Sequence, residues 1–458
     1  MVTELHSTRA VVAQTLERQL RLGPQSAAQL TAALGVSQPT LSRAIHRLGS
    51  SITSFKLTGE RTPRYALLRF LPEGVGARQR IYRVLRSGTI EPFADVEFLA
   101  GGATLERMGR ATRLYTGLPP YMVFASPSGF LGRQAAEFAS RGRSSLPPHL
   151  KDWGDDHRVV YLFTHGTHPP GNLLFGEFMV QLALDSMRIG PTPVSQKREH
   201  YDSMATTLRE ASYGSSAGGE QPKFLSVVED AGHVIVKFAR HGSRMAELLP
   251  LEHLALGALA AVGVPAAPTQ LLASQDYVFL EVQRFDRVGP HGRVGMLSAG
   301  SVDDEYFGQR DTWSQFAARC EQARYISAVH ARHIDVMAAF SELIGNNDRH
   351  FENVSLLIGE DGQYQGVAPA YDILPMRYAS IGGGVDPALV PITPKVGAVG
   401  ANPAVWSAAA RAAERFWTAV QTVELAAPIS RAFRQLAKTN LRVARDFVQP
   451  LLPAGTPS

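Results

Sequence analysis

The sequence predicts an α+β protein made of a small basic head and a larger body in which helices and strands are mixed. The chain has 458 residues, of which 45% are hydrophobic and 19% charged, so it can form more than one folded core and is not disordered. Its charge is unevenly spread: residues 1–90 contain 13 Lys and Arg but 4 Asp and Glu, whereas residues 91–458 contain 33 and 37. Apolar residues recur at helical spacing in some segments and at strand spacing in others. We therefore expect the basic head to bind a polyanion.

The compartment is indicated by what the sequence lacks. Its one cysteine, Cys320, cannot form an internal disulfide or a zinc finger, which is typical of a reducing cytosol. The first residues have no long apolar signal core, and no run of 18 apolar residues follows. We expect a cytoplasmic protein with no membrane partner.

Three helices are predicted in the head. Apolar spacing predicts the first over Thr8–Leu22. Ser26 is placed to cap a second helix that ends at Gly35, and Ser37 to cap a third. The segment "LGVSQPTLSRAIHRL" is therefore typical of a helix-turn-helix.

Two short strands are predicted after these helices, over Ile52–Leu57 and Arg64–Phe70, around a basic turn, and together they resemble a winged helix-turn-helix. The third helix presents side chains that suit base edges and phosphates in a major groove, which are Gln38, Thr40, Ser42, Arg43, His46 and Arg47. We expect this head to bind duplex DNA as part of a dimer. The alternative is a helical protein-interaction module.

The middle of the chain, residues 73–200, has weaker patterns. Helices are predicted over Arg78–Leu85 and Pro92–Met108, a strand, a turn and a helix over residues 121–140, and a strand over residues 157–166. A helix is expected to start within residues 171–187, after a glycine turn. No catalytic constellation stands out here, and we expect this region to form the first lobe of the larger domain.

Two segments after residue 210 have features of a phosphate site. Residues 212–224, "SYGSSAGGEQPKF", combine small residues with Lys223, so backbone N–H groups can surround an anion. Lys237 follows on an alternating strand, "GHVIVKF", as does the lysine with which protein kinases hold ATP phosphates. Such a lysine needs a carboxylate partner, and Glu247 and Glu252 lie on the helix predicted over Ala246–Val262.

Two later segments supply the remaining groups of a phosphoryl-transfer site. A buried strand in "YVFLEVQRFDR" leads to a hinge between lobes. In "LIGNNDRHFENVSLL", Asp348 and Asn353 are five residues apart, and Asp372 follows in "APAYDILP". Phosphoryl transfer needs a carboxylate that accepts the proton of the acceptor hydroxyl, and oxygen ligands for Mg²⁺. Asp-x-x-x-x-Asn followed by a further Asp has the spacing of the protein-kinase catalytic loop.

The motifs "GGEQPKF", "IVKF", "VQRFDR", "GNNDRHFENVSLL" and "YDILP" resemble the HipA family of Ser/Thr kinases, the toxins of HipBA-type toxin–antitoxin modules. The similarity covers roughly residues 160–450, and the added helix-turn-helix makes the chain similar to the YjjJ-type members. The resemblance implies a bilobed protein-kinase-like fold. It also implies that Asp348 is the catalytic base and that Asn353 and Asp372 hold Mg²⁺.

The resemblance further implies an ATP site. Its residues would be Gly218, Gly219, Glu220, Gln221, Pro222, Lys223, Lys237, Gln283, Arg284, Phe285, His350 and Tyr371, with Glu252 as the partner of Lys237. A serine five residues before the glutamine of the loop is autophosphorylated in such kinases, which points to Ser216, with Ser212 and Ser215 as alternatives. A phosphate there would repel ATP.

The predicted division is a winged helix-turn-helix over residues 1–72, an N-lobe with an additional subdomain over 73–285, and a mostly helical C-lobe over 286–458. We expect DNA and a protein substrate as partners, and the resemblance suggests an aminoacyl-tRNA synthetase or other translation factor as that substrate. Two alternatives stay open: a DNA-binding regulator whose kinase fold only senses nucleotide, and a small-molecule kinase. Two helices predicted at the C-terminus, 404–422 and 430–448, are rich in arginine, which is typical of a solvated face or of a nucleic-acid surface.

Overall fold

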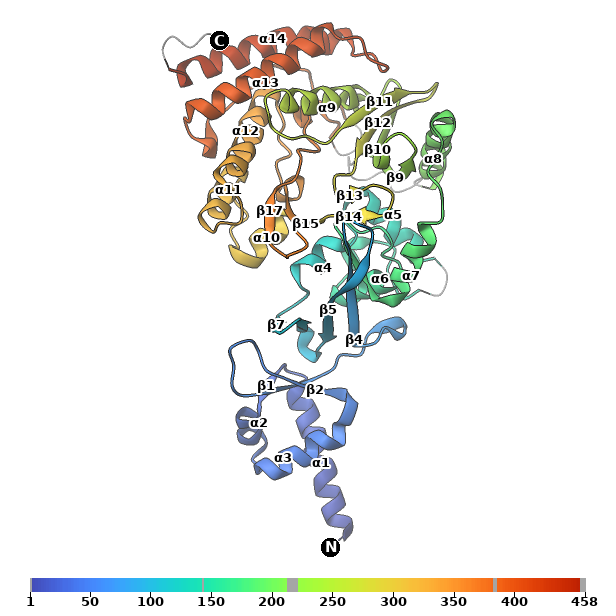
Figure 1. The fold of residues 1–458 in the computed structure, drawn as a ribbon, viewed down its shortest axis with the longest axis vertical. Coiled ribbons are helices and arrows are strands. Elements are labelled where there is room, and N and C mark those ends of the chain that lie inside the picture. The colour runs from blue at the N-terminus through green and yellow to red at the C-terminus, as the bar shows by residue number, and fades with distance from the viewer. Residues whose placement is uncertain (1, 142–143, 212–220, 382–384, 454–458) are drawn as a thin grey trace. The chain divides into compact units, whose positions relative to one another are not determined.

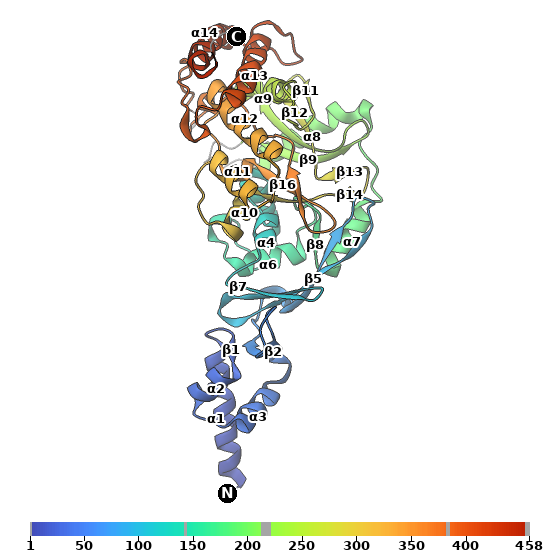
Figure 2. The same ribbon diagram turned by 60° about the vertical axis from the view of Figure 1, so that its left-hand side comes forward.

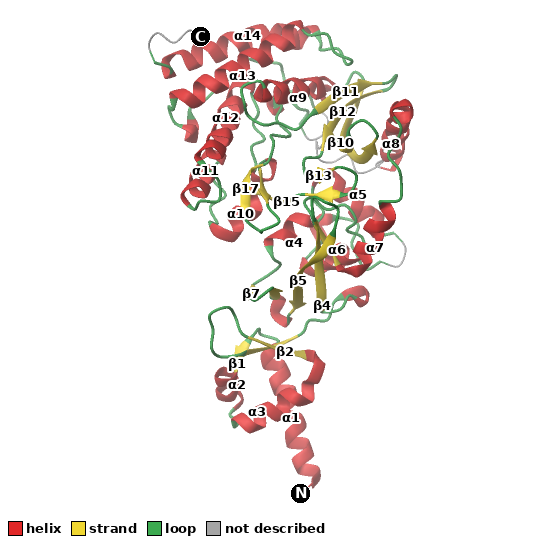
Figure 3. Cartoon of the chain, viewed as in Figure 1, coloured by secondary structure: helices red, strands yellow, loops and turns green. Residues whose placement is uncertain are grey.

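The structure is a computed structural model that describes residues 2–141, 144–211, 221–381 and 385–453. The chain forms two compact units (Figure 1). The first comprises Met1–Val84, Thr89–Ser128 and Gly132–Ser186, and the second comprises Leu85–Gly88, Gly129–Leu131 and Met187–Ser458. Both units contain helices and strands (Figure 3), so the predicted α+β class is confirmed.

The first unit begins with three helices and a small antiparallel sheet of order β1-β3-β2. These elements are α1 (Val2–Leu20), β1 (Gln25–Ser26), α2 (Ala27–Leu34), α3 (Gln38–Leu48), β2 (Ile52–Phe55) and β3 (Arg64–Leu67). Local chemistry explains the ends of α2. The Ser26 hydroxyl accepts the Gln29 N–H while the Gln29 side chain accepts the Ser26 N–H, and Gly35 ends the helix at φ +62°. The helices and strands predicted for residues 8–70 are therefore present, within a few residues at each end.

A five-stranded antiparallel sheet of order β7-β6-β5-β4-β8 follows in the same unit. Its strands are β4 (Arg78–Val84), β5 (Ile90–Phe98), β6 (Thr104–Met108), β7 (Ala111–Tyr115) and β8 (Leu173–Phe175). The helices of this region are α4 (Pro120–Ala125), α5 (Gly129–Ala139), α6 (Asp155–Thr164) and α7 (Gly176–Ser186). The helix expected after a glycine turn is α7, which begins directly after β8.

Four predictions for this region were wrong. The segments Arg78–Leu85 and Pro92–Met108 contain the strands β4, β5 and β6 rather than helices, and charged residues that face each other across β4 and β5 form ion pairs such as Arg80–Asp95 at 2.8 Å. Residues 157–164 belong to the helix α6 rather than to a strand, and α4 replaces the strand expected near residue 121. The apolar run of α6 is buried on several sides, so it has no polar face to reveal helical spacing.

The head and the five-stranded sheet share an apolar core. Phe55 of β2 and Ala66 of β3 are buried in one cluster with Leu99 and Leu105. The Arg78 guanidinium of β4 also donates to the backbone carbonyls of Ser50 and Ile52. The predicted boundary after residue 72 therefore separates two parts that pack on each other, and the three-part division stays a prediction.

The second unit contains a four-stranded antiparallel sheet of order β11-β12-β10-β9. Its elements are α8 (Lys197–Ala211), β9 (Lys223–Val228), β10 (Gly232–Arg240), α9 (Arg244–Ala260), β11 (Thr269–Ala273) and β12 (Tyr277–Gln283). The predicted strands at Lys237 and at residues 277–283 are β10 and β12, and the predicted helix after Lys237 is α9. A two-stranded ribbon, β13 (Arg287–Val288) and β14 (Gly292–Arg293), follows.

The rest of the second unit is mainly helical. It contains a three-stranded sheet of β15 (Gly295–Ser298), β16 (Ser355–Ile358) and β17 (Tyr364–Val367), and the helices α10 (Ala299–Tyr306), α11 (Trp313–Gln322), α12 (Ala328–Ile344), α13 (Pro403–Thr422) and α14 (Arg431–Val448). Helix α13 packs against α9, α12 and α14 (Figure 2). Trp406 and Trp417 of α13 are fully buried, and the Trp417 indole donates to the Leu343 carbonyl at the end of α12 at 2.9 Å. This core holds the end of α12 in place.

Among the helices of the described residues, none combines the length and the apolar character that crossing a membrane requires.

We predict that Phe55→Ala lowers the free energy of unfolding of the first unit by about 3 kcal/mol, because it leaves a cavity in the core that the head shares with the sheet. Urea denaturation followed by circular dichroism measures this change. The neighbouring exposed residue provides a control, since Lys56→Ala should change stability by less than about 0.5 kcal/mol. Equal stability of the two variants would contradict the shared core.

Candidate functional site

A buried lysine lies at the centre of the second unit's four-stranded sheet. Lys237 is on β10, opposite Leu280 of β12 and Lys223 of β9, and its side chain is 7% exposed. Its Nζ donates to Glu252 Oε1 at 2.6 Å and Oε2 at 2.8 Å, and to Asp372 Oδ1 at 2.6 Å. One ammonium therefore joins carboxylates from two distant segments of the chain.

Helix α9 supplies the first of these carboxylates. The Ser243 hydroxyl caps the helix by accepting the Ala246 N–H. Glu252 is buried two turns later. Glu247, the other acidic residue considered for this pairing, forms an ion pair with Arg244 at 3.0 Å instead. Of the two glutamates, Glu252 is thus the one in contact with Lys237.

The charges at this site control one another's protonation. Burial by itself would lower the pKa of Lys237, but the Asp372 and Glu252 carboxylates more than offset burial, so this pKa is raised. Burial likewise opposes ionisation of Asp372, and the positive charges of Lys237 and Lys223 hold its pKa below the usual range. Lys237 is therefore charged and Asp372 is ionised at neutral pH. Burial raises the pKa of Glu252.

Asp372 has an unusual backbone conformation. Its φ is +55°, in the left-handed region that residues with a Cβ seldom adopt. The preceding residues are held firmly, because the Ala370 carbonyl accepts the Ala267 N–H at 2.9 Å and the Tyr371 hydroxyl donates to the Glu352 carbonyl at 2.7 Å. These bonds direct the Asp372 carboxylate toward Lys237.

The loop after α12 carries the Asp-x-x-x-x-Asn motif. Gly345 ends the helix at φ +79°. The Asn346 side chain then accepts the Asp348 N–H at 3.1 Å, and the Asn353 amide donates to the Asp348 carbonyl at 3.0 Å. The side chain of Asp348 is 44% exposed. The loop thus leaves the Asp348 side chain exposed to solvent. The side-chain nitrogen of Asn353 is engaged as a donor, and the side-chain oxygen of Asn353 remains able to accept a hydrogen bond or bind a cation.

An ion-pair chain on this loop was not recognised in the sequence. His350 lies 3.3 Å from Glu352 and 3.8 Å from Asp348, and Arg310 lies 2.7 Å from Glu352. The hydrogen bond that His350 donates to Glu352 raises the pKa of His350 and lowers the pKa of Glu352 to about 2. Glu352, which lies between His350 and Asn353 in the motif, could have indicated such an ion pair, but its partner Arg310 is distant in sequence.

The residues expected at the adenine end occupy the end of β12 and the turn after it. Gln283 is exposed, and its side chain donates to the Ala231 carbonyl at 3.1 Å. The Phe285 ring lies 5.6 Å from that of Tyr371. Arg284 forms a buried ion pair with Asp286 at 2.7 Å, so its guanidinium is engaged within the protein.

The predicted nucleotide loop is only partly described. Gly218, Gly219 and Glu220, and the candidate autophosphorylation sites Ser212, Ser215 and Ser216, lie outside the described residues. At the end of the loop, the Gln221 side chain donates to the Phe238 carbonyl at 2.5 Å, and the Pro222 carbonyl accepts the Phe238 N–H at 3.0 Å. These bonds hold the loop's end beside β10, one residue from Lys237.

The oxygen donors present fit a magnesium ion better than a metal held by protein alone. In the described part of the chain, no three His, Cys, Asp or Glu side chains are grouped to hold a metal. Asp372 and Asn353 supply one anionic and one neutral donor, and Mg²⁺ commonly takes one or two carboxylates and completes its shell with phosphates and water.

The residues expected to contact DNA lie on α3. Gln38, Ser42, Arg43 and Arg47 are exposed, whereas Thr40 is half-buried and its hydroxyl lies 3.1 Å from that of Ser37. His46 is also exposed. The helix therefore presents a polar face that includes two arginines, and it packs inward through Leu41 and Ala44.

We predict that Lys237→Met lowers the free energy of unfolding of the second unit by about 3–5 kcal/mol, because it leaves the buried Glu252 carboxylate and the partly exposed Asp372 carboxylate without a counter-charge. Urea denaturation measures the loss. Lys438→Met, at an exposed position on α14, should have little effect. Stability should return in part in the double variant Lys237→Met, Glu252→Leu, and a single variant as stable as the parent would refute the pairing.

Known proteins match the chain along most of its length. The family model HipA-like C-terminal domain matches residues 215–441, and the model YjjJ-like toxin, middle domain, matches residues 75–184. The toxin YjjJ of Escherichia coli strain K12 is 32% identical over 431 residues, which cover 91% of this chain and 94% of YjjJ.

Two solved structures are more distantly similar. A chain of the HipA, HipB and operator DNA complex from Shewanella oneidensis MR-1 is 15% identical with a TM-score of 0.49, covering 81% of this chain and 99% of its own. The proinflammatory kinase CtkA of Helicobacter pylori is 11% identical with a TM-score of 0.37, covering 50% of this chain and 92% of its own. The resemblance predicted from the motifs around Lys237, Asp348 and Asp372 is confirmed by the two family matches and the identity to YjjJ. Because that identity extends over nearly all of both chains, and a HipA-like C-terminal domain spans the residues that build the site, the chain belongs to the family of HipA-like toxins.

Proposed function

We propose that the chain is an ATP-dependent Ser/Thr protein kinase of the HipA type. The observation that carries the proposal is the buried Lys237, which is bonded to Glu252 and to the left-handed Asp372. A buried charge needs strong partners, and burying this cluster of charged side chains is less favourable in free energy than filling the same space with apolar ones. A role beyond stability is therefore the better explanation for the cluster. Protein kinases place a strand lysine, a helix glutamate and a metal-binding aspartate in the same relation.

The chain's own residues would divide the reaction between them. Asp348, exposed at the start of the loop, would orient the acceptor hydroxyl and take its proton. Lys237 and Lys223 would hold ATP phosphates as fixed positive charges, with Glu252 keeping Lys237 in place. Gln283, Arg284 and Phe285 would border the adenine, with Tyr371 against Phe285 and His350 beside Asp348.

Asn353 and Asp372 would hold Mg²⁺, which would neutralise phosphate charge when bound. Both side chains are firmly placed before a ligand arrives, Asn353 by its bond to the Asp348 carbonyl and Asp372 by its bond to Lys237. Such preorganisation lowers the cost of positioning the reacting groups.

A serine before Gln221 would be the autophosphorylation site, with Ser216 first and Ser212 and Ser215 as alternatives. The segment ends where Gln221 and Pro222 are bonded to Phe238, beside Lys237. A phosphate there would add almost two negative charges next to the ATP phosphates and would switch the enzyme off. The other acceptor would be a cytoplasmic protein, such as an aminoacyl-tRNA synthetase or another translation factor, as the HipA resemblance suggests.

The N-terminal part would act as a winged helix-turn-helix that binds duplex DNA, in a homodimer. Support comes from α3, where Gln38, Ser42, Arg43 and Arg47 are exposed, and from the exposed Lys56 and Arg61 around the turn between β2 and β3. Arg64, also expected in this basic turn, is paired with Glu60 and contributes less charge. Thr40, whose hydroxyl lies 3.1 Å from that of Ser37, would support DNA binding by stabilising the start of α3. DNA binding by the same chain would allow the protein to regulate its own expression.

We predict that Asp348→Ala lowers phosphate incorporation from ATP at least about 100-fold, because the acceptor hydroxyl loses its base. Mass spectrometry after incubation with ATP and Mg²⁺ should find phosphate on Ser212, Ser215 or Ser216 in the parent protein and on none of them in the variant. Asp361→Ala, which changes an exposed aspartate between β16 and β17, serves as the control and should keep full incorporation. Equal incorporation by Asp348→Ala and the parent would refute the assigned base. DNA binding that responds to ATP without any phosphate transfer would favour a nucleotide-sensing regulator instead.

We predict that Arg47→Ala weakens binding to duplex DNA and lowers the slope of log affinity against log salt by about 1, because one phosphate contact is lost. Fluorescence anisotropy with a labelled duplex at several salt concentrations measures both. Arg198→Ala removes an equal charge from an exposed position on α8 and should leave the slope unchanged. A slope that is equally unchanged for Arg47→Ala would argue against α3 as the contact helix.

A further inference from the structure

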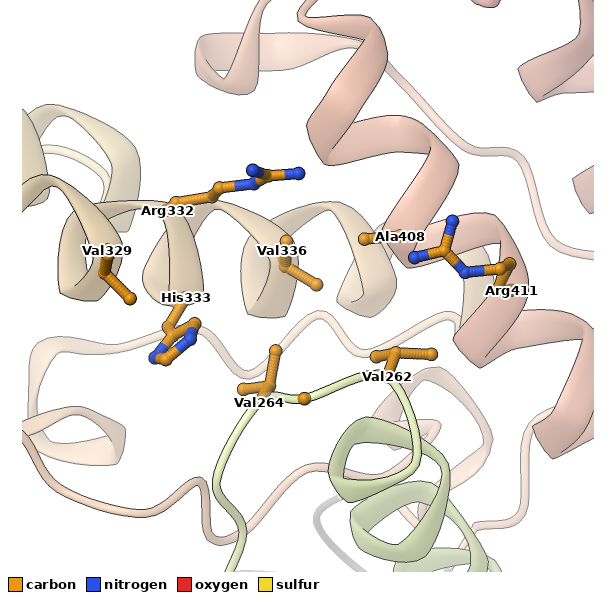
Figure 4. A pocket seen from close by; sticks show the side chains of 9 residues that line it. Val262, Val264, Val329, Arg332, His333, Val336, Ala408 and Arg411 are labelled. Carbon is orange, nitrogen blue, oxygen red and sulfur yellow. The ribbon is translucent and has the colours of Figure 1, made fainter. Parts of the chain in front are cut away.

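A small pocket lies on the helical part of the second unit, away from the residues assigned to ATP (Figure 4). It is formed by the turn after α9, by α12 and by α13, and its volume is about 200 Å³. Val262 and Val264 come from the turn, Val329 and Val336 from α12, and Ala408 from α13. These residues give the pocket an apolar floor.

Three basic side chains border this floor. Arg332 and His333 come from α12 and Arg411 comes from α13. The guanidiniums contact neutral oxygens: Arg332 donates to the Ala404 carbonyl at 3.3 Å, and Arg411 to the Ser407 hydroxyl at 3.0 Å. Among the residues that the structure describes, none of those lining the pocket is acidic.

Other arginines of the same region are paired with carboxylates. Arg319 lies 2.9 Å from Asp303, Arg434 lies 3.4 Å from Glu424, and Arg445 pairs with Glu414. Within the described residues, neither Arg332 nor Arg411 forms such an ion pair. Two arginines of the basic stripe predicted for the C-terminal helices, Arg434 and Arg445, are therefore paired with carboxylates, whereas Arg411 has no ion pair within the described residues.

We propose that this pocket docks an acidic segment of a protein partner, with one apolar side chain seated on the valine floor and flanking carboxylates on Arg332 and Arg411. Pockets for small organic ligands usually measure about 300–1,000 Å³, so this one is better matched to a single anchoring side chain. The positive charge without carboxylate partners selects an acidic neighbour for that anchor. Burial and the charges of His330 and Arg332 lower the pKa of His333, so at neutral pH this ring can serve as a neutral hydrogen-bonding group.

The pocket is separate from the proposed catalytic loop. Val329, His333 and Val336 lie in the first half of α12, whereas the loop with Asp348 follows its last residue, Ile344. From Val336 to Ile344 the helix rises about 12 Å. A partner docked here would leave Asp348 uncovered, and the inference does not depend on kinase activity.

The test uses a fluorescein-labelled heptapeptide whose central leucine is flanked on each side by an aspartate and a glutamate. We expect saturable binding to the full chain by fluorescence anisotropy, weakening as salt rises. The double variant Arg332→Glu, Arg411→Glu should bind at least about tenfold more weakly, because two attractions become repulsions. Val329→Asp changes an exposed residue of the pocket and should weaken binding similarly even if the double variant folds poorly.

The double variant Arg431→Glu, Arg442→Glu makes the same charge change at exposed positions on α14 and should bind as the parent does. A peptide with glycine in place of the central leucine should bind more weakly, because the valine floor then holds no anchor. The proposal is overturned by absence of saturable binding, by equal affinity of the pocket variants and the parent, or by equal affinity of the leucine and glycine peptides. Complete displacement of the peptide by inorganic phosphate at matched ionic strength would assign the basic groups to a small anion and would also overturn it.

Discussion

The buried ammonium of Lys237 is the interaction on which the second unit depends. It joins a central strand, a helix and a segment 135 residues further along the chain through one atom, Nζ. Because Lys237 and Glu252 are almost wholly removed from water, with side chains 7% and 1% exposed, loss of either charge would leave the other uncompensated, and the partly exposed Asp372 would lose its counter-charge with Lys237. The sheet that carries Lys237 and the helical core that positions Asp372 are therefore coupled electrostatically as well as through packing.

The backbone around the site fixes the positions of these groups. Asp372 takes a left-handed conformation after Tyr371, whose hydroxyl is bonded to the Glu352 carbonyl. Asn353 is fixed by the Asp348 carbonyl, while the Asp348 side chain stays exposed. Strain of this kind persists only where surrounding contacts overdetermine it, and it is concentrated at functional sites. The buried tryptophans of α13, one of them bonded to Leu343, provide that support at the end of α12.

Arginine is the usual cation of this chain. Arginines that are paired with carboxylates stabilise the fold, whereas arginines without a carboxylate partner can bind a ligand. In the first unit, arginines of β4 neutralise acids of β5 and so stabilise the sheet. In the second unit, Arg284 and Arg287 are buried around Asp286. On α3 and around the pocket between α12 and α13, by contrast, Arg47, Arg332 and Arg411 have no carboxylate partner within the described residues. Those positions are the ones to which we assign nucleic-acid and protein ligands.

The sequence by itself determined what depends on near neighbours. The caps at Ser26 and Gly35, the alternation that makes β10 a strand, and the spacing of Asp348 and Asn353 are all local patterns, so the head, the kinase-like order of motifs and the family resemblance could be read directly. Only the tertiary structure decided that residues 78–84, 90–98 and 104–108 form strands, because the partners that pair across the sheet, such as Arg80 and Asp95, are brought together only by the fold. It likewise paired Lys237 with Glu252 instead of Glu247, paired Arg284 with Asp286, and paired Arg310 with Glu352 of the loop after α12. In each case two or more side chains of suitable chemistry were available, and long-range geometry, which one-dimensional spacing does not contain, chose between them.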